Sequence, residues 1–489
     1  MFIYILILSI LFMNIPVQAS AKSPAIPSDI PYILIDAKTG AVLVGQHEDE
    51  RYGPASTTKI MTAILALEKG DPGKEMTVSE AAVNDIGRAG MNIGIMAGEK
   101  GLKLENLLNV MLIKSANETA NIIAENIAPT RKDFVAMMNQ KAKEIGAVNT
   151  TFLNSCGKDT EKADNGHLTT PRDLAMITRY AMTIPKFRQI VSTEYYKGMP
   201  VTDKHDDWGT LRNTNQFLWH DNTYPYTLNG ADHKYTVIGV KTGYTAKAGN
   251  NLVTAADGED GTELIAVVMH VMQSNKIYGY SKELIRYGFE NFSTVKVSEA
   301  GQVAGSIPVE GAKDAGTLLG LTEGTGFSCV LPIGTDIKSL ETKLDIPKKI
   351  NAPVNKGDIV GTLEYMNKGV SLGKVQLLAA SSVEAAPEAV TETEAGKTSG
   401  DRQPGYSWFI LGILVFFSLI VALRPVLRSL SRNLKKRRGE TGKPDTVKSQ
   451  QDAVKAQPVD EEEEQDYERL RRIIKGELPD PNGAQQDNE

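Results

Sequence analysis

Two kinds of periodicity divide the first 290 residues of the chain. Residues 32–45 predict a β-hairpin: Ile33 and Ile35 alternate along a first strand, residues 37–40 form a turn, and Val42 to Val44 return as a second strand. From Pro54 to Gly70 the apolar residues recur at helical intervals instead. Further helical patterns cover 102–113, 117–127, 131–145, 171–183 and 278–287, and strand patterns cover 236–242, 250–256 and 263–271.

This order of elements predicts the domain organisation. Strands at both ends of a region, with helices between them, predict an α+β domain over residues 22–293, with a mixed sheet and a helical cluster. Near Val295 the chain changes to short strands broken by Gly and Pro, which predicts a small all-β domain over 294–379. Residues 380–405 have the composition of a flexible linker.

The two longest apolar runs lie near the ends of the chain. The first ends in small residues and predicts a secretory signal peptide over residues 1–21, although no Lys or Arg precedes it. An uncleaved N-terminal anchor is the alternative. The second run predicts a transmembrane helix over 406–424, because an aromatic residue precedes it and a strongly basic stretch follows it. We therefore expect a single-pass protein of the cell membrane, with its folded domains outside and a mostly disordered cytoplasmic tail over 425–489.

Charge and cysteine content narrow the classes of function. The formal net charge of −6 argues against a nucleic-acid-binding protein, which normally has a basic face. The two cysteines, Cys156 and Cys329, fall in different predicted domains. Export permits a disulfide, but two separate thiols are the favoured interpretation and the pairing stays open.

The first candidate for chemistry is Ser56, followed three residues later by Lys59 at the start of a predicted helix. This spacing puts both side chains on one face. A neutral Lys59 can take the proton of the serine hydroxyl and make it a nucleophile, and burial or a nearby cation favours the neutral form. The alternative is a helix-capping serine beside a solvated lysine, which the isolated motif favours.

The second candidate is Ser115-Ala116-Asn117, a polar elbow between two apolar helices. Ser115 can relay a proton and Asn117 can hydrogen-bond a substrate amide. Alternatively, Asn117 only caps the helix that follows.

The third candidate is Lys241-Thr242-Gly243, at the end of a predicted strand. A cation and a hydroxyl there can receive a carboxylate, and the glycine lets a substrate backbone approach closely. The same three letters at residues 38–40 fall in the hairpin turn before Ser56, so we discard them.

Together, the order and context of these motifs resemble the active-serine penicillin-recognising enzymes, whose motifs are Ser-x-x-Lys, Ser-x-Asn and Lys-Thr-Gly. More specifically, residues 25–380 resemble the low-molecular-mass penicillin-binding proteins that act as D-alanyl-D-alanine carboxypeptidases. The stretches that carry the resemblance are PASTTKIMTA, SANETA, FLNSCGKDTEKADNGHLTTPRDLA and GVKTGYTAKAGNNLV. The resemblance implies a β-lactamase/transpeptidase-like domain followed by the β-rich domain.

The resemblance also implies roles for the motif residues. Ser56 would attack the carbonyl between two terminal D-alanines of a peptidoglycan stem peptide, and Lys59 would accept its proton. The backbone N–H groups of Ser56 and Tyr244 would form the oxyanion hole. Ser115 would help to protonate the leaving D-alanine. Lys241 and Thr242 would bind the terminal carboxylate, with Lys241 also lowering the pKa of Lys59. β-Lactams would acylate Ser56, and no metal or other cofactor is implied.

Three features depart from this family or add to it. Carboxypeptidases of this group commonly carry Gly-Leu where this chain has Gly157-Lys158, and Cys156 precedes that pair. The group usually ends in an amphipathic helix on the membrane surface, not in a spanning helix with a tail. His167 and Asp173 match a family segment. The favoured interpretation is a hydrogen-bonded loop histidine and a helix-start aspartate that braces the site, and a direct catalytic role is the alternative.

Other functions remain as alternatives. A class A β-lactamase needs a Glu-activated water, and no convincing Glu-x-x-x-Asn element is found between the second and third motifs. A zinc peptidase is disfavoured because the six histidines show no ligand spacing. A D,D-endopeptidase or a wall-binding scaffold stays open. The identity of the third stem-peptide residue and the oligomeric state do not follow from the sequence.

Overall fold

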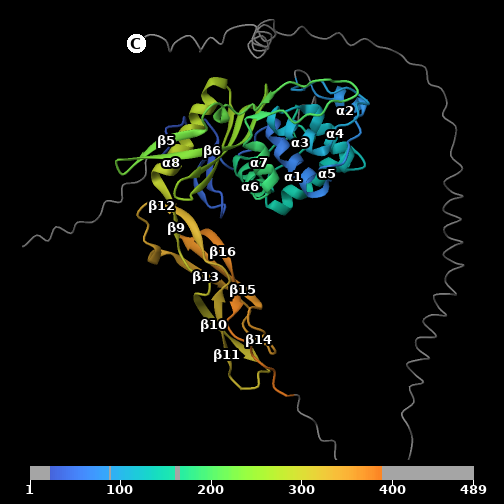
Figure 1. Cartoon of the computed structure of the whole chain (residues 1–489). Coiled ribbons are helices and arrows are strands. Elements are labelled where there is room, and N and C mark those ends of the chain that lie inside the picture. Colours follow the sequence, from blue (N-terminus) through green and yellow to red (C-terminus); the bar gives the residue numbers. More distant parts are fainter. Residues whose placement is uncertain (1–22, 88–89, 160–165, 388–489) are drawn as a thin grey trace, which may run out of the picture. The chain divides into compact units, whose positions relative to one another are not determined.

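Two six-stranded sheets organise residues 23–87, 90–159 and 166–387, the part of the chain that the computed structural model describes (Figure 1). In spatial order, the first sheet contains β2 (Val42–Gln46), β1 (Tyr32–Asp36), β8 (Glu263–Val271), β7 (Gly249–Gly258), β6 (Ala231–Thr245) and β5 (Thr223–Leu228). A separate short pair is formed by β3 (Tyr195–Tyr196) and β4 (Leu211–Arg212).

Eight α-helices accompany this first sheet in the described ranges. They are α1 (Lys59–Lys69), α2 (Glu80–Asn84), α3 (Leu104–Ile113), α4 (Asn117–Ile127), α5 (Arg131–Ile145), α6 (Pro171–Met182), α7 (Pro185–Val191) and α8 (Ile277–Asn291). Short 3₁₀ segments include η1 (Ala55–Thr58), directly before α1, and η2 (Gln216–Leu218).

Alternating residues of the sheet are buried on both of its faces. On β8, Ile265 and Val267 belong to the core formed with the helical cluster, whereas Leu264 and Val268 belong to the core formed with α8. Because successive strand residues point to opposite faces, β8 can fill both cores only if it is apolar throughout. Residues 264–269, LIAVVM, form the continuous apolar run that this requires, which agrees with the position of β8 in the middle of the sheet.

The predicted α+β architecture is confirmed. Every strand pairing in the first sheet is antiparallel. Strands from both ends of the domain lie side by side in it, because β1, from the start of the domain, pairs with β8, from its end. This closure brings the η1 segment, just after the hairpin, beside β6. The discarded residues 38–40 lie in the hairpin turn, where Gly40 has φ +82°.

The second sheet forms the β-rich domain. Its spatial order is β13 (Glu341–Asp345), β15 (Ile359–Asn367), β16 (Val370–Ala379), β11 (Leu318–Glu323), β10 (Val303–Glu310) and β14 (Ile350–Asn351). A two-stranded pair, β9 (Phe292–Lys296) with β12 (Ser328–Pro332), connects it to the first domain. At this joint the amide of Val330 donates to the carboxylate of Asp36 at 3.2 Å.

Several predicted segments lie outside the described residues. These are the signal peptide, the membrane-spanning run at 406–424, the cytoplasmic tail and nearly all of the linker. Among the residues that the structure does describe, no helix is both long and apolar enough to span a bilayer. Cys156 and Cys329 are both free and buried, in the helical core and in the β-rich core respectively, so the expectation of two separate thiols is confirmed.

Candidate active site

Ser56 and Lys59 lie on one face of a continuous helical segment. Ser56 is in η1, and Lys59 is the first residue of α1. The side-chain nitrogen of Lys59 donates to the hydroxyl of Ser56 at 2.9 Å. The alternative of a capping serine beside a solvated lysine is wrong: no side chain caps α1, and Lys59 is fully buried.

Lys59 has three acceptors, which match the three N–H groups of an ammonium. Besides the Ser56 hydroxyl, the acceptors are Oδ1 of Asn117 at 2.6 Å and the carbonyl oxygen of Cys156 at 2.7 Å. Burial lowers the pKa of Lys59 to about 8, because the charged form loses its water. A neutral Lys59 keeps only two N–H groups. If these stay on Asn117 and Cys156, its lone pair faces Ser56, whose hydroxyl can then donate its proton.

A second lysine–serine pair adjoins the first. Lys241 on β6 is 1% exposed and donates to the hydroxyl of Ser115 at 2.9 Å and to the carbonyl of Thr242 at 3.0 Å. Ser115 occupies the elbow between α3 and α4 with a left-handed φ of 62°. Burial, and after it the charge of Lys59, hold the pKa of Lys241 well below its usual range.

The end of β6 runs directly beside Ser56. A Cβ atom added to Gly243 would lie 3.1 Å from the amide nitrogens of Ser56 and Thr57 and from the carbonyl oxygen of Pro54. These distances are tighter than most Cβ contacts, so a side chain at this position would require η1 or the strand to shift by a few tenths of an ångström. Tyr244 follows with its side chain 64% exposed, so its contribution at this point is its backbone.

Thr242 has a partner that the sequence analysis did not identify. Its hydroxyl lies 2.8 Å from the hydroxyl of Thr214, which comes from the segment between β4 and η2. A lone Thr in the stretch LRNTNQ carries no recognisable signal for this contact, because β6 and that segment meet only in the folded sheet.

Asn117 is held on both sides of its amide. Its Oδ1 accepts from Lys59, and its Nδ2 donates to the carbonyl of Ile86 at 2.7 Å. The alternative interpretation as a helix cap is wrong, because Ala116 is the N-cap of α4 and no side chain caps the helix. Asn117 therefore orients Lys59 in this structure.

His167 and Asp173 lie behind these groups. The Nδ1 atom of His167 accepts from the amide of Leu153 at 2.8 Å, and its Nε2 atom lies 2.8 Å from the hydroxyl of Thr58. Burial lowers the pKa of His167 to about 4, so it is neutral and donates from Nε2. The Asp173 carboxylate accepts from the amide of Asn149 at 2.7 Å. These contacts agree with a hydrogen-bonded loop histidine and a helix-start aspartate, and the bracing role of Asp173 stays a prediction.

Gly157 and Cys156 also border the site. Gly157 has φ +88°, and an added Cβ would lie 1.8 Å from the carbonyl oxygen of Ala55. The segment 154–157 thus packs against η1 and brings the Cys156 carbonyl to Lys59. Sequence reasoning noted Cys156 for its thiol, whereas the structure uses its backbone. Within the described ranges, no group of three His, Cys, Asp or Glu side chains can hold a metal ion.

Comparison with known proteins agrees with this geometry. Residues 17–273 match the family model for peptidase family S11, described as D-alanyl-D-alanine carboxypeptidase. Residues 292–385 match the model for the penicillin-binding protein 5 C-terminal domain. D-alanyl-D-alanine carboxypeptidase DacF of Bacillus subtilis is 29% identical over 353 residues, which is 70% of this chain and 82% of that protein. DacC of Escherichia coli K12 is 28% identical over 377 residues, which is 75% of this chain and 87% of that protein.

Solved structures show the same relationship. The chain resembles penicillin-binding protein 5 from Haemophilus influenzae with a TM-score of 0.58 and 26% identity, over 73% of this chain and 99% of that one. The resemblance to low-molecular-mass penicillin-binding proteins is therefore confirmed, as is the fold that it implied. Because the family model matches more than half of its length, the chain belongs to the D-alanyl-D-alanine carboxypeptidases of peptidase family S11.

Proposed function

We propose that the chain is a serine D-alanyl-D-alanine carboxypeptidase that removes the terminal D-alanine from peptidoglycan stem peptides through an acyl-enzyme at Ser56. The observation that carries this function is the buried nitrogen of Lys59, 2.9 Å from the Ser56 hydroxyl. A serine with a base of depressed pKa within hydrogen-bond distance is the arrangement that nucleophilic catalysis requires. The family assignment supports the same reaction.

The acylation step follows from this pair. Neutral Lys59 takes the proton as Ser56 Oγ bonds to the carbonyl carbon of the penultimate D-alanine. The C–N bond then breaks, and Ser115 relays the proton that Lys59 took from Ser56 to the leaving amine, which restores neutral Lys59. Ser115 is suited to that relay because its hydroxyl contacts Lys241 at 2.9 Å in the adjoining pair. Water then hydrolyses the ester and regenerates Ser56.

Backbone amides would stabilise the negative charge that develops on the carbonyl oxygen. We assign this role to the N–H groups of Ser56 and Tyr244. The close packing of Gly243 against the amide of Ser56 supports the pairing, since it brings the end of β6 to η1. Loss of one such donor costs about 3–4 kcal/mol of transition-state stabilisation in other serine enzymes.

The terminal carboxylate of the substrate would bind at the end of β6. We assign its recognition to Lys241 and Thr242, with Gly243 giving the peptide backbone room to lie along the strand. The Thr214 hydroxyl, 2.8 Å from that of Thr242, adds a donor at the same place. β-Lactams mimic the D-Ala-D-Ala end of the substrate and acylate Ser56 as inhibitors.

The location of the enzyme is a separate proposal. A signal peptide over 1–21 and a transmembrane helix over 406–424 would place the catalytic domain outside the cell membrane, with the β-rich domain as a pedestal. The apolar run with an aromatic residue before it and basic residues after it supports this. Protease added to intact cells should remove the catalytic domain and leave the tail protected. Recovery of the full chain in the soluble fraction would contradict the proposal.

The activity test uses the full-length protein in detergent. Incubation with a peptide ending in Lys-D-Ala-D-Ala should release D-alanine, and Ser56→Ala should abolish release. Penicillin should label the wild type and not the mutant. Labelling without release would favour the D,D-endopeptidase alternative, and loss of both in the wild type would favour a wall-binding scaffold.

A further inference from the structure

Two loops supply the groups that fix Lys59, although neither loop touches Ser56 through a side chain. The loop after α2 contributes the carbonyl of Ile86, which anchors Asn117. The segment 154–157 contributes the carbonyl of Cys156, which accepts from Lys59 at 2.7 Å. The position of Lys59 therefore depends on how these two loops are held relative to each other.

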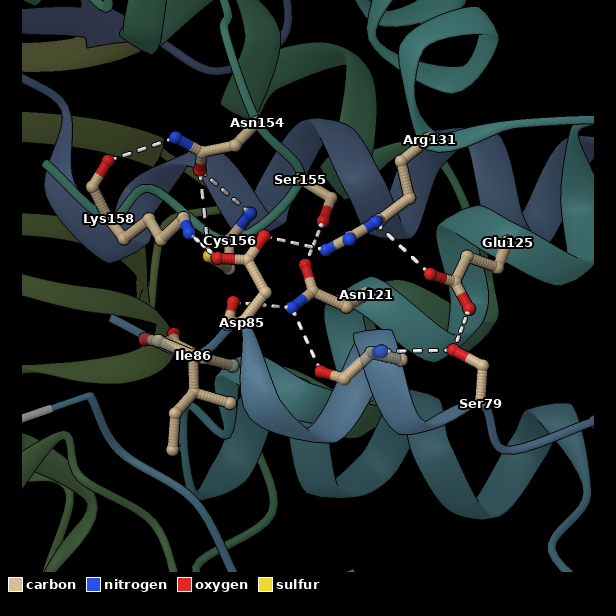
Figure 2. A network of polar contacts seen from close by, with 12 residues as sticks. Ser79, Asp85, Ile86, Asn121, Glu125, Arg131, Asn154, Ser155, Cys156 and Lys158 are labelled. Atoms are coloured by element: carbon tan, nitrogen blue, oxygen red, sulfur yellow. Dashed lines mark hydrogen bonds and ion pairs between the residues drawn. The ribbon is translucent and has the colours of Figure 1, made fainter. Parts of the chain in front are cut away.

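An ion pair joins the two loops. The ammonium of Lys158 bonds to the carboxylate of Asp85, the residue before Ile86 (Figure 2). The Lys158 stem covers Gly87, where an added Cβ would meet Cβ of Lys158 at 3.3 Å. Lys158 directly follows the Cys156-Gly157 pair, so the bridge lies at the point where both loops reach the site.

Further charged and polar side chains connect this ion pair to helices α4 and α5. Arg131 on α5 contacts Asp85 at 2.8 Å and Glu125 on α4 at 3.1 Å, and Ser79 donates to Glu125 at 2.5 Å (Figure 2). These four side chains, with Lys158, form what we call the loop clamp. A carboxylate that accepts from two cations on different elements has little freedom to move, which suits Asp85 to fixing a loop.

Neutral hydrogen bonds tie the same loops to α4. Asn121 lies one helical turn after Asn117, and its Nδ2 donates to the carbonyl of Asp85 at 2.9 Å. Its Oδ1 accepts from Ser155 at 2.9 Å. Asn154 closes the second loop by donating to the carbonyl of Lys158 at 2.9 Å. The helix that carries Asn117 thus also connects the two loops through Asn121, whose bonds to Asp85 and Ser155 are drawn in Figure 2.

We propose that Lys158 is a positioning residue for the carboxypeptidase reaction: its bridge to Asp85 holds the two loops so that Cys156 and Asn117 keep Lys59 against Ser56. This inference rests on the proposed function. A leucine, the common residue after this glycine in the group that the chain resembles, has no charge with which to hold Asp85.

Loosening the bridge should change the environment of Lys59. The ionisable groups that face Lys59 are Lys241 on β6, Glu118 on α4 and the thiol of Cys156. Burial is the largest influence on its pKa, and the loops provide part of that burial. If the loops separate and admit water, the charged form of Lys59 is stabilised and acylation requires a higher pH.

The test measures penicillin acylation and D-alanine release between pH 6 and 9 with full-length protein. Lys158→Met keeps the apolar stem and removes the charge. It should lower kcat about tenfold, with a smaller change in KM, and shift the acid limb of the acylation profile to higher pH. Lys158→Arg keeps the charge and should recover most of the rate. Asp85→Asn should reproduce the loss and serves as the second variant if Lys158→Met folds poorly.

Lys141→Met is the matched control. Lys141 forms a comparable partly buried bridge, to Glu68 at 2.8 Å, away from both loops. Its removal should leave kcat and the acid limb unchanged. Equal behaviour of Lys158→Met and Lys141→Met in an active wild-type background would overturn the inference while leaving the proposed function intact. An inactive, unlabelled wild type would instead overturn the proposed function.

Discussion

The nitrogen of Lys59 and the hydroxyl oxygen of Ser56 lie 2.9 Å apart, and the lysine that makes this contact is fully buried. Burial lowers the pKa of Lys59 to about 8, whereas a solvated lysine would stay charged at neutral pH. The contact therefore joins a nucleophile to a base that is partly neutral near physiological pH. An ordinary surface lysine at the same distance would lack this property.

The first prediction concerns the pH dependence of acylation. Only neutral Lys59 accepts the Ser56 proton, so the rate of penicillin acylation should rise about tenfold per pH unit below pH 8 and level off above it. Stopped-flow labelling with a fluorescent penicillin between pH 6 and 9 measures this. Lys59→Arg, which stays charged, should be inactive throughout. A rate that is flat from pH 6 to 9 would rule out Lys59 as the base.

The second prediction compares two glycines with similar backbone conformations. Gly157 and Gly146 have φ of +88° and +92°, but an added Cβ meets the Ala55 carbonyl at 1.8 Å at the first and nothing within 4 Å at the second. Gly146→Ala should cost only the left-handed strain, about 1 kcal/mol. Gly157→Ala should cost about 3 kcal/mol or more and abolish acylation, because η1 must move. Urea unfolding and penicillin labelling of both variants distinguish these effects. Equal costs would mean that the contact with η1 is not rigid.

Local patterns predicted the elements that carry the motifs. The helical spacing of residues 117–127 and 131–145 agrees with the bounds of α4 and α5. In α5 the buried residues Phe134, Met138 and Ala142 are four positions apart, which is the spacing of one helix face. The short helices α2 and α7, of five and seven residues, were missed. A helix of one or two turns has too few apolar positions to show a period.

Local geometry alone predicted contacts in the site only where one motif contains both partners. The meeting of the three motifs was predicted from the family resemblance. Ser56 and Lys59 are three residues apart, so helical geometry alone brings them together. The Thr214–Thr242 contact depends on sheet register, and the acceptor at Cys156 is a backbone carbonyl, which no residue type specifies. Such contacts arise from the packing of segments that are distant in the sequence.

The third prediction concerns stability in acid. His167 is neutral in the folded state, with a pKa of about 4 against an ordinary 6.5. Between these values the unfolded chain binds the proton and the folded chain does not, so stability falls as the pH drops from 6.5 to 4. The contribution is about 3 kcal/mol. His167→Gln should be less stable at pH 7 but lose less on acidification. Urea unfolding at pH 7 and at pH 4.5 measures the stability of each protein and the loss on acidification. An equal loss in the two proteins would mean that His167 is protonated in the fold.

The fourth prediction concerns the two thiols. Cys156 and Cys329 are free, buried and in separate cores, and burial raises the pKa of Cys329 to about 12. Because both thiols are shielded from solvent, neither should react with a maleimide in the native protein, and both should react in urea. A reductant should leave the melting temperature unchanged. Cys329→Ser would put a hydroxyl into an apolar core and should lower stability by about 1–3 kcal/mol, whereas Cys329→Ala should cost less. A melting temperature that falls on adding reductant would instead show that the two cysteines pair.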